Sequence, residues 1–191
     1  KGTMVEDDSI TLFSMLEGEL YFKNDQQVEN DYFTGHPDLF IGDDIYHATE
    51  VNDIKSSWEL DSFTPKLIEG IDKSYEAQLN VYYDLTGASC GHLVYCLVSA
   101  PESIVLSEKR RLLYSMDVVS EESPSYVKAA KELERLMIFD DISPEERIIK
   151  IPVPKNDELI EKMKNKVPKL REWLYNFEKK HLSLYSKYAI V

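Results

Sequence analysis

An apolar run from Gly91 to Ala100 is the feature that most restricts how this chain can fold. The run contains the segment His-Leu-Val-Tyr-Cys-Leu-Val-Ser and ends at Pro101. A short apolar run that stops at a proline predicts a buried β-strand. The segment 72–86, which stops at Gly87, predicts a helix directly before this strand. The chain is therefore expected to build a sheet that contains this strand and is flanked by helices.

The remaining segments add strands and helices in a mixed order. Acidic residues followed by apolar residues at helical spacing predict a first helix over 4–18. Strands are expected at 19–23, 31–34, 39–41, 45–55 and 148–153, and helices at 102–115, 123–139 and 155–188, the last as one helix or as two broken before Pro168. This order predicts an α/β (α+β) core with a mixed sheet.

The charge of the chain is unevenly distributed. The formal net charge is −13, which argues against a generic binder of nucleic acid or anionic membrane. Residues 1–146 carry 30 acidic and 11 basic side chains, whereas residues 147–191 carry 5 acidic and 11 basic ones. The basic last segment therefore needs an explanation of its own.

Several classes of protein are disfavoured by simple counts. The two cysteines, Cys90 and Cys96, fit neither a metal knuckle nor a disulfide framework, and we expect both to be buried thiols. No apolar run approaches the length of a membrane span, so no membrane partner is expected. The chain begins at Lys1 without methionine or a signal-peptide pattern, so we expect a fragment or missing first residues, in a cytoplasmic setting.

Asp53 and Lys55 are the strongest local indication of chemistry. Side chains alternate along a strand, so these two share one face while Ile54 points into the core. An acid beside a lysine can serve as a metal ligand with a cation that orients or deprotonates a water. The same pattern is also typical of an exposed ion pair.

Asp38 is the second candidate, because a hairpin could bring it to Asp53. A turn signal at 42–44 separates the strands 39–41 and 45–55. If the hairpin centres near 45–46, Asp38 falls opposite Asp53, whereas a tight turn at 43–44 would need a β-bulge to correct the register. Two converging carboxylates repel unless a cation lies between them, and their hard oxygens suit Mg²⁺ or Mn²⁺. Alternatively, Asp38 is an ordinary turn residue after a proline.

Two further groups could complete such a site. Gln78 and Tyr82 lie four residues apart and share one face of the helix 72–86, where they could bind a phosphate or support metal ligands. Glu6, in the pattern Gly2-x-x-x-Glu6, could add a carboxylate from the first helix, with Glu17 and Glu19 as weaker rivals. The simpler interpretations are a half-buried helix face and an acid favoured by the helix dipole.

Taken together, these motifs resemble a known family of nucleases. The segments Gly35-His36-Pro37-Asp38, Asp53-Ile54-Lys55 and Gln78-x-x-x-Tyr82 resemble, in this order, the RecB-like branch of the PD-(D/E)xK nuclease superfamily. The pattern Gly2-x-x-x-Glu6-Asp7 resembles the helix-borne glutamate motif of the phage lambda exonuclease-like, YqaJ-type viral recombinase family. The resemblance covers about residues 2–101.

The resemblance implies a fold and a division into parts. It implies a restriction-endonuclease-like core over 1–153 and a basic helical extension of the same domain over 154–191. The middle acid, Asp53, is Glu in the lambda enzyme, although the RecB-like branch accepts Asp. Some relatives carry a four-cysteine cluster, which a chain with two cysteines cannot form.

The resemblance also implies a role for each candidate residue. Asp38, Asp53 and the main-chain carbonyl of Ile54 would bind Mg²⁺ or Mn²⁺, with Glu6 close to the metal directly or through water. Lys55 would activate or orient the attacking water. Gln78 and Tyr82 would support the site or hold DNA.

The function expected on this basis is a Mg²⁺-dependent exodeoxyribonuclease that acts on linear duplex ends in phage recombination or repair. Its relatives imply a ring-shaped homo-oligomer and a single-strand annealing protein as possible partners. The alternatives are a structure-selective or site-specific endonuclease of the same fold, or a catalytically inactive DNA-binding or interaction module.

The basic helix expected over 155–188 has two interpretations. Its lysines and arginine alternate with Trp173, Tyr175 and Phe177, which could form a surface that follows DNA phosphates. The interpretation we favour is a solvated amphipathic helix whose aromatic rings pack on the core.

Overall fold

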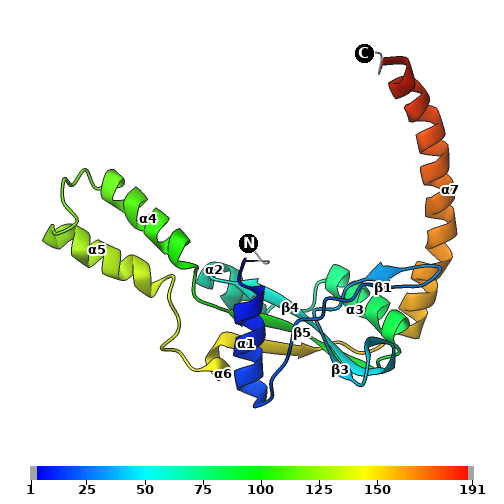
Figure 1. Cartoon of the computed structure of the whole chain (residues 1–191), viewed down its shortest axis with the longest axis horizontal. Helices are drawn as coiled ribbons and strands as arrows, with labels where there is room; N and C mark the ends of the chain where they lie inside the picture. Colours follow the sequence, from blue (N-terminus) through cyan, green and yellow to red (C-terminus); the bar gives the residue numbers. More distant parts are fainter. Residues whose placement is uncertain (1–3, 189–191) are drawn as a thin grey trace.

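A four-stranded mixed sheet forms the centre of the computed structural model, which describes residues 4–188 and side chains as far as His181. The strands are β3 (Leu39–Gly42), β4 (Ala48–Ser57), β5 (Cys90–Leu97) and β6 (Ile148–Pro152), in the spatial order β3-β4-β5-β6 (Figure 1). The β4 and β5 strands are parallel, and both outer pairs are antiparallel. The structure confirms the predicted α/β class with a mixed central sheet flanked by helices.

Two helices cover the two faces of this sheet. The helix α1 (Glu6–Glu17) packs on the face that carries Ile54, Val94 and Cys96. The helix α3 (Lys73–Thr86) packs on the opposite face, with Val51 and Leu93. Alternation along β4 and β5 therefore divides the apolar residues into two cores, one under each helix.

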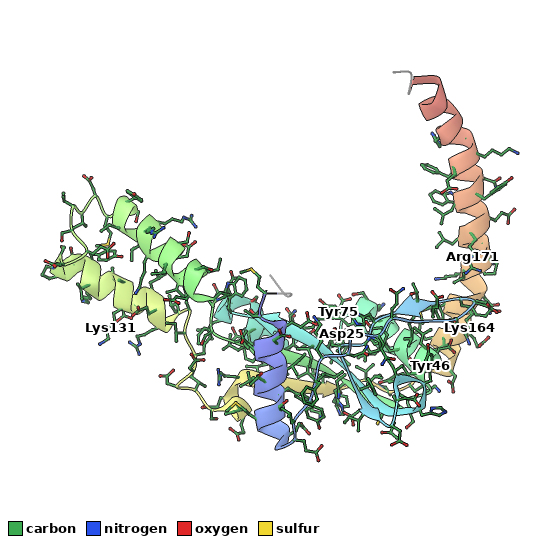
Figure 2. All side chains as sticks on the ribbon, in the orientation of Figure 1. Asp25, Tyr46, Tyr75, Lys131, Lys164 and Arg171 are labelled. Carbon is green, nitrogen blue, oxygen red and sulfur yellow. The ribbon has the colours of Figure 1, made fainter. Side chains whose placement is uncertain are left out.

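The shorter elements and the two projecting parts complete the fold. They are β1 (Val28–Glu29), β2 (Thr34–Gly35), η2 (Ile45–His47), α2 (Leu60–Phe63), η3 (Thr64–Leu67), α4 (Glu102–Ser115), α5 (Pro124–Arg135), α6 (Pro144–Arg147) and α7 (Asp157–Tyr188). The helices α4 and α5 pack together and project from one side of the body, while α7 leaves from the other (Figure 1). Lys164 and Arg171 lie where α7 departs (Figure 2).

Local signals explain where the central helices begin and end. The side chain of Asp72 caps the start of α3 by accepting a hydrogen bond from the Ser74 N–H. Gly87 ends α3 in the left-handed conformation, as its position in the sequence predicts, and Gly18 ends α1 in the same way.

Several expectations about the elements need correction. The segment 19–23 is not a strand, because its main chain finds no neighbouring strand to pair with, and of 31–34 only Thr34 enters β2. The strand expected from 45 begins at Ala48, after the turn η2. The helix α5 ends four residues before the expected 139. Of the two alternatives for 155–188, the structure has one continuous helix, α7, with Pro168 inside it. The aromatic rings of α7 are exposed and do not pack on the core, contrary to the interpretation favoured from the sequence. Cys96 is buried, whereas Cys90 is exposed.

Two further expectations concern membrane-spanning segments and the division of the chain into parts. Among residues 4–188, no helix is long and apolar enough to cross a membrane. The division into a core over 1–153 and an extension over 154–191 stays a prediction, as does the cytoplasmic location.

Gly91 is required by the close approach of β5 to β4. A methyl group at this position would lie 2.1 Å from the main-chain oxygen of Val51 and 3.0 Å from the hydroxyl of Tyr83. We expect Gly91→Ala to lower the free energy of unfolding by about 3 kcal/mol or more, because main-chain atoms cannot move aside cheaply. Urea unfolding checks this value against Gly70→Ala, where no atom lies within 4 Å and the change should stay within about 0.5 kcal/mol. Equal stability of the two variants would contradict the described packing.

Candidate active site

The register of the β3–β4 hairpin brings Asp38 to Asp53. Leu39 pairs with Asn52 and Phe40 pairs with Val51, so continuing this register by one residue places Asp38 opposite Asp53. This register corresponds to a hairpin centred near 45–46, the first of the two alternatives, and the β-bulge between Ile41 and Gly42 lies closer to the turn. The pairing of the two carboxylates is therefore a property of the sheet.

Asp53 and Lys55 lie on the face of β4 that is covered by α3. Asp53 is only 1% exposed, and Lys55 Nζ lies 2.6 Å from Asp53 Oδ2. The Lys55 ammonium also lies 4.7 Å from the centre of the Tyr75 ring, which favours a cation in that position. Ile54 packs in the core under α1, as the alternation predicts. The ion pair joins a buried carboxylate to a half-buried lysine, in contrast to the exposed pair that the sequence left open.

Asp38 is held beside this pair by the main chain of β4. The Ile54 N–H donates a hydrogen bond to Asp38 Oδ2 at 2.7 Å. Burial and the neighbouring Asp53 carboxylate raise the pKa of Asp38 to about 6, against the opposing effects of the Ile54 N–H and Lys55. Burial also raises the pKa of Asp53, although Lys55 opposes this rise. One lysine therefore only partly compensates two neighbouring carboxylates, of which Asp53 is buried and Asp38 is half-buried.

The Oδ2 atom of Asp53 has a cation nearby but, among the described residues, no well-aligned hydrogen-bond donor. Asp53 Oδ2 is buried and, among the described residues, has no hydrogen-bond donor aligned with it, even though Lys55 Nζ is close enough for an ion pair. A buried carboxylate oxygen in this condition is stabilised by an additional cation.

Gln78 and Tyr82 lie beside the carboxylates and hold the chain before Asp38. Gln78 Nε2 donates to the Tyr82 hydroxyl at 2.7 Å, and this hydroxyl donates to the His36 carbonyl at 3.2 Å. Burial raises the pKa of Tyr82 to about 12, so the hydroxyl keeps its proton and remains a donor. Gly35 permits the contact, because a methyl group there would lie 2.9 Å from the Tyr82 ring.

Asn24 fixes the same segment, and the sequence analysis missed it. Its side-chain amide donates to the Pro37 carbonyl at 2.8 Å, and its main-chain N–H donates to the Asp38 carbonyl at 2.9 Å. Together with Tyr82, Asn24 satisfies three successive carbonyls from His36 to Asp38. A single asparagine in a polar segment carries no sequence signal for this contact.

Glu6 lies in the same cavity as the two aspartates, but it has a partner of its own. Glu6 Oε2 lies 2.9 Å from the ammonium of Lys23, a residue that the sequence did not single out. Of its rivals, Glu17 pairs instead with Lys150, and neither Glu17 nor Glu19 is among the residues that line the cavity. Gly2, the other half of this motif, lies outside the described residues.

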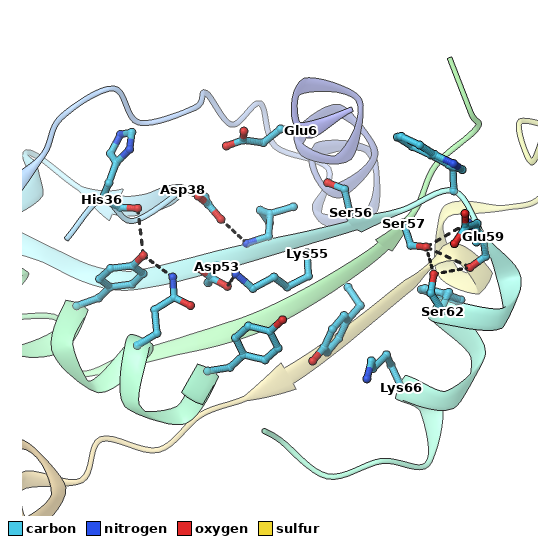
Figure 3. Close-up of a pocket in the computed structure, with 17 residues that line it drawn as sticks. Glu6, His36, Asp38, Asp53, Lys55, Ser56, Ser57, Glu59, Ser62 and Lys66 are labelled. Atoms are coloured by element: carbon cyan, nitrogen blue, oxygen red, sulfur yellow. Dashed lines mark hydrogen bonds and ion pairs between the residues drawn. The ribbon is translucent and has the colours of Figure 1, made fainter. Parts of the chain in front are cut away.

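One cavity of about 540 Å³ brings the candidate residues together (Figure 3). It is lined by all seven residues predicted from the sequence: Glu6, Asp38, Asp53, Ile54, Lys55, Gln78 and Tyr82. Further along the cavity lie Ser57, Ser62 and Lys66, where the two serine hydroxyls share a hydrogen bond. Alternation from Lys55 places Ser57 on the same face of β4, so the sequence could have found it, whereas Ser62 and Lys66 enter from α2 and η3.

The donor set suits a hard divalent cation that keeps some of its water. Among the described residues, no three His, Cys, Asp or Glu side chains gather into a metal-binding group. Two carboxylates do converge, from Asp38 and Asp53, and Mg²⁺ is commonly held in proteins by one or two carboxylates with water and substrate oxygens. The two raised pKa values fit such a cation.

Comparison with solved structures shows that other proteins share this fold. One is a phage-related exonuclease from Haemophilus somnus 129PT, with a TM-score of 0.68 and 20% identity over 94% of this chain and 71% of that one. Another is the alkaline exonuclease LHK-Exo from Laribacter hongkongensis, with a TM-score of 0.60 and 13% identity over 98% of this chain and 73% of that one. No family model and no curated protein matches the sequence. At these identities the likeness establishes the fold.

The raised pKa of Asp38 predicts a stability gain on neutralising it. The folded pKa of about 6 lies above the ordinary value, so its contribution to stability is present below pH 3.8 and is lost as the pH rises through 6. In EDTA at pH 8, Asp38→Asn should therefore exceed the wild type by roughly 1–3 kcal/mol, and the gain should shrink towards pH 5. Urea unfolding at both pH values measures it.

The control for this experiment is the exposed Asp43. The variant Asp43→Asn changes the net charge equally but removes no buried carboxylate, so it should show no comparable gain. A wild type that is as stable as Asp38→Asn at pH 8 would show that the carboxylate pair is not under electrostatic strain.

Proposed function

We propose that this chain is a divalent-metal-dependent deoxyribonuclease of the PD-(D/E)xK type that acts on the ends of duplex DNA. The observation that carries the proposal is the convergence of the half-buried Asp38 and the buried Asp53, with Lys55 beside them, in one cavity. Holding two carboxylates together lowers the stability of the fold, and with a lysine beside them these groups could bind a metal and orient a water. This favours a functional role over a structural one.

The metal in this proposal is Mg²⁺ or Mn²⁺. Asp38, Asp53 and the main-chain carbonyl of Ile54 would hold it, and Glu6 would contribute directly or through water once released from Lys23. When bound, such a cation neutralises phosphate charge and lowers the pKa of water.

The residues of the chain would orient the attacking water and stabilise the charge that develops on the phosphate. Water attacks phosphorus, the bond to the ester oxygen breaks, and the leaving oxygen receives a proton, so that the products are a phosphate monoester and a hydroxyl. Lys55 would orient this water or donate a hydrogen bond to charge that develops on the phosphate, and its position beside Asp53 supports this role. Gln78, Tyr82 and Asn24 act by fixing the chain that carries Asp38.

An exonuclease is preferred over the alternatives for two reasons. The two similar structures are both named exonucleases, which favours action at DNA ends over site-specific cleavage. Asp38, Asp53 and Lys55 are all present and brought together, which disfavours an inactive binding module. The ring-shaped oligomer, the annealing partner and a role in recombination or repair stay predictions of the resemblance.

Cleavage of DNA tests the proposal directly. The wild type should degrade an end-labelled linear duplex with Mg²⁺ and leave it intact in EDTA, and it should leave covalently closed circular DNA intact. Lys55→Ala should lower the rate on the linear duplex by about 100-fold or more, because it removes the only lysine paired with Asp53 among the described residues.

A lysine remote from the cavity provides the matched control. Lys131 is exposed on α5 (Figure 2), and Lys131→Ala should retain the wild-type rate. Wild-type activity in Lys55→Ala would refute the proposed site, and cleavage of the closed circle would favour the endonuclease.

A further inference from the structure

Residues 21–24 form a short strap that passes beside α1 and is tied to the body at both ends. At its start, the Tyr21 N–H donates a hydrogen bond to the Ser14 hydroxyl of α1 at 3.0 Å. At its end, Asn24 binds the carbonyls of the segment that leads to the first aspartate of the site. Lys23 lies directly before Asn24, so these contacts fix the position of its main chain.

From this position, Lys23 pairs with a carboxylate of the cavity. Its ammonium donates a hydrogen bond to Glu6 Oε2 at 2.9 Å, and this bond raises the pKa of Lys23, so the lysine keeps its charge. The two side chains are only 33% and 18% exposed, so water and salt screen them less than a surface ion pair. Lys23 itself is not among the described residues that line the cavity, so it reaches the site through Glu6.

Glu6 in turn acts on both aspartates. It extends from the first turn of α1 into the cavity, on the side of Asp38 (Figure 3). Burial is the largest cause of the raised pKa of Asp38 and of Asp53, and the negative charge of Glu6 adds to the rise at both. A divalent cation held by the two aspartates would therefore attract the Glu6 carboxylate as well, while Lys23 holds the same group.

We propose that Lys23 competes with the divalent cation for Glu6 and thereby lowers the affinity of the site for metal. The inference rests on the proposed function, because it takes Asp38 and Asp53 as the metal ligands. Glu6 can turn towards the metal, directly or through water, only by leaving or sharing its contact with Lys23, and the loss of that contact weakens metal binding. Lys23 is thus a positioning residue that acts through Glu6.

The affinity for Mn²⁺ in the absence of DNA measures this competition without depending on cleavage. Lys23→Met keeps an unbranched side chain but removes its charge, so we expect it to bind Mn²⁺ about threefold to tenfold more tightly than the wild type. Lys23→Arg keeps the charge and should stay within about twofold of the wild type. Electron paramagnetic resonance of the free ion gives these dissociation constants.

A second variant shows whether the effect passes through Glu6. In Glu6→Gln, the carboxylate for which the two cations compete is absent. Adding Lys23→Met to Glu6→Gln should therefore change the affinity for Mn²⁺ by less than about twofold. A Lys23 that only kept the strap folded, or that acted on the aspartates by its charge alone, would have the same effect with and without Glu6.

Lys150 provides a matched control on the same helix. Its ammonium lies 3.0 Å from Glu17 Oε1, with side chains that are 27% and 28% exposed, so this pair also joins a lysine to a carboxylate of α1. Glu17 does not line the cavity. Lys150→Met should leave the affinity for Mn²⁺ within about twofold of the wild type. Equal tightening in Lys150→Met and Lys23→Met would assign the effect to net charge or to a looser α1 and would overturn the inference.

The remaining outcomes separate the inference from the proposed function. Binding of Mn²⁺ to Lys23→Met that is unchanged or weaker would overturn the inference, and weaker binding would mean that Lys23 holds Glu6 ready for the metal. If Asp38→Asn still abolishes binding in that case, the proposed metal site stands without the inference. A lack of Mn²⁺ binding in both the wild type and Lys23→Met would contradict the metal site of the proposed function, and the inference with it.

Discussion

The electrostatic repulsion between two neighbouring carboxylates, one buried and one half-buried, is the constraint on which the proposed site depends. Asp38 and Asp53 would separate in a flexible chain, yet both lie in one cavity with raised pKa values and with a single lysine, Lys55, paired with Asp53 among the described residues. The fold holds them by sheet register and by the Ile54 N–H. A cation bound at the carboxylates, as proposed, would relieve this repulsion, so an affinity for metal and a lower stability of the metal-free protein would have the same cause.

The surrounding structure keeps this arrangement in place from both faces of the sheet. The core under α1 holds Ile54, and α3 covers the face with Asp53 and Lys55. The segment before Asp38 is held near Asp53, because Tyr82 and Asn24 donate hydrogen bonds to its carbonyls. The two helices and the loop with Asn24 therefore support the carboxylates that the sheet register brings together, although of these residues only Gln78 and Tyr82 of α3 and Glu6 of α1 were expected to matter.

The sequence predicted those parts of the site that depend on the alternation of side chains along one strand or on the register of one hairpin. The shared face of Asp53 and Lys55 follows from the alternation of one strand, and the approach of Asp38 follows from the hairpin centre near 45–46. Asn24, Lys23 and Lys66 could not be predicted, because each reaches the site from a loop or short turn whose path depends on tertiary contacts. The same limit explains why 19–23 was expected to be a strand, since strand formation requires a neighbour that the sequence does not identify.

The most direct test of the account is binding of Mn²⁺ to the protein without DNA, followed by electron paramagnetic resonance of the free ion. The wild type should remove free Mn²⁺ from solution at a site that Asp38→Asn and Asp53→Asn both abolish, while Asp43→Asn retains it. Binding that is unchanged in Asp38→Asn and Asp53→Asn, or absent from the wild type, would show that the carboxylate pair is not a cation site and would contradict the account.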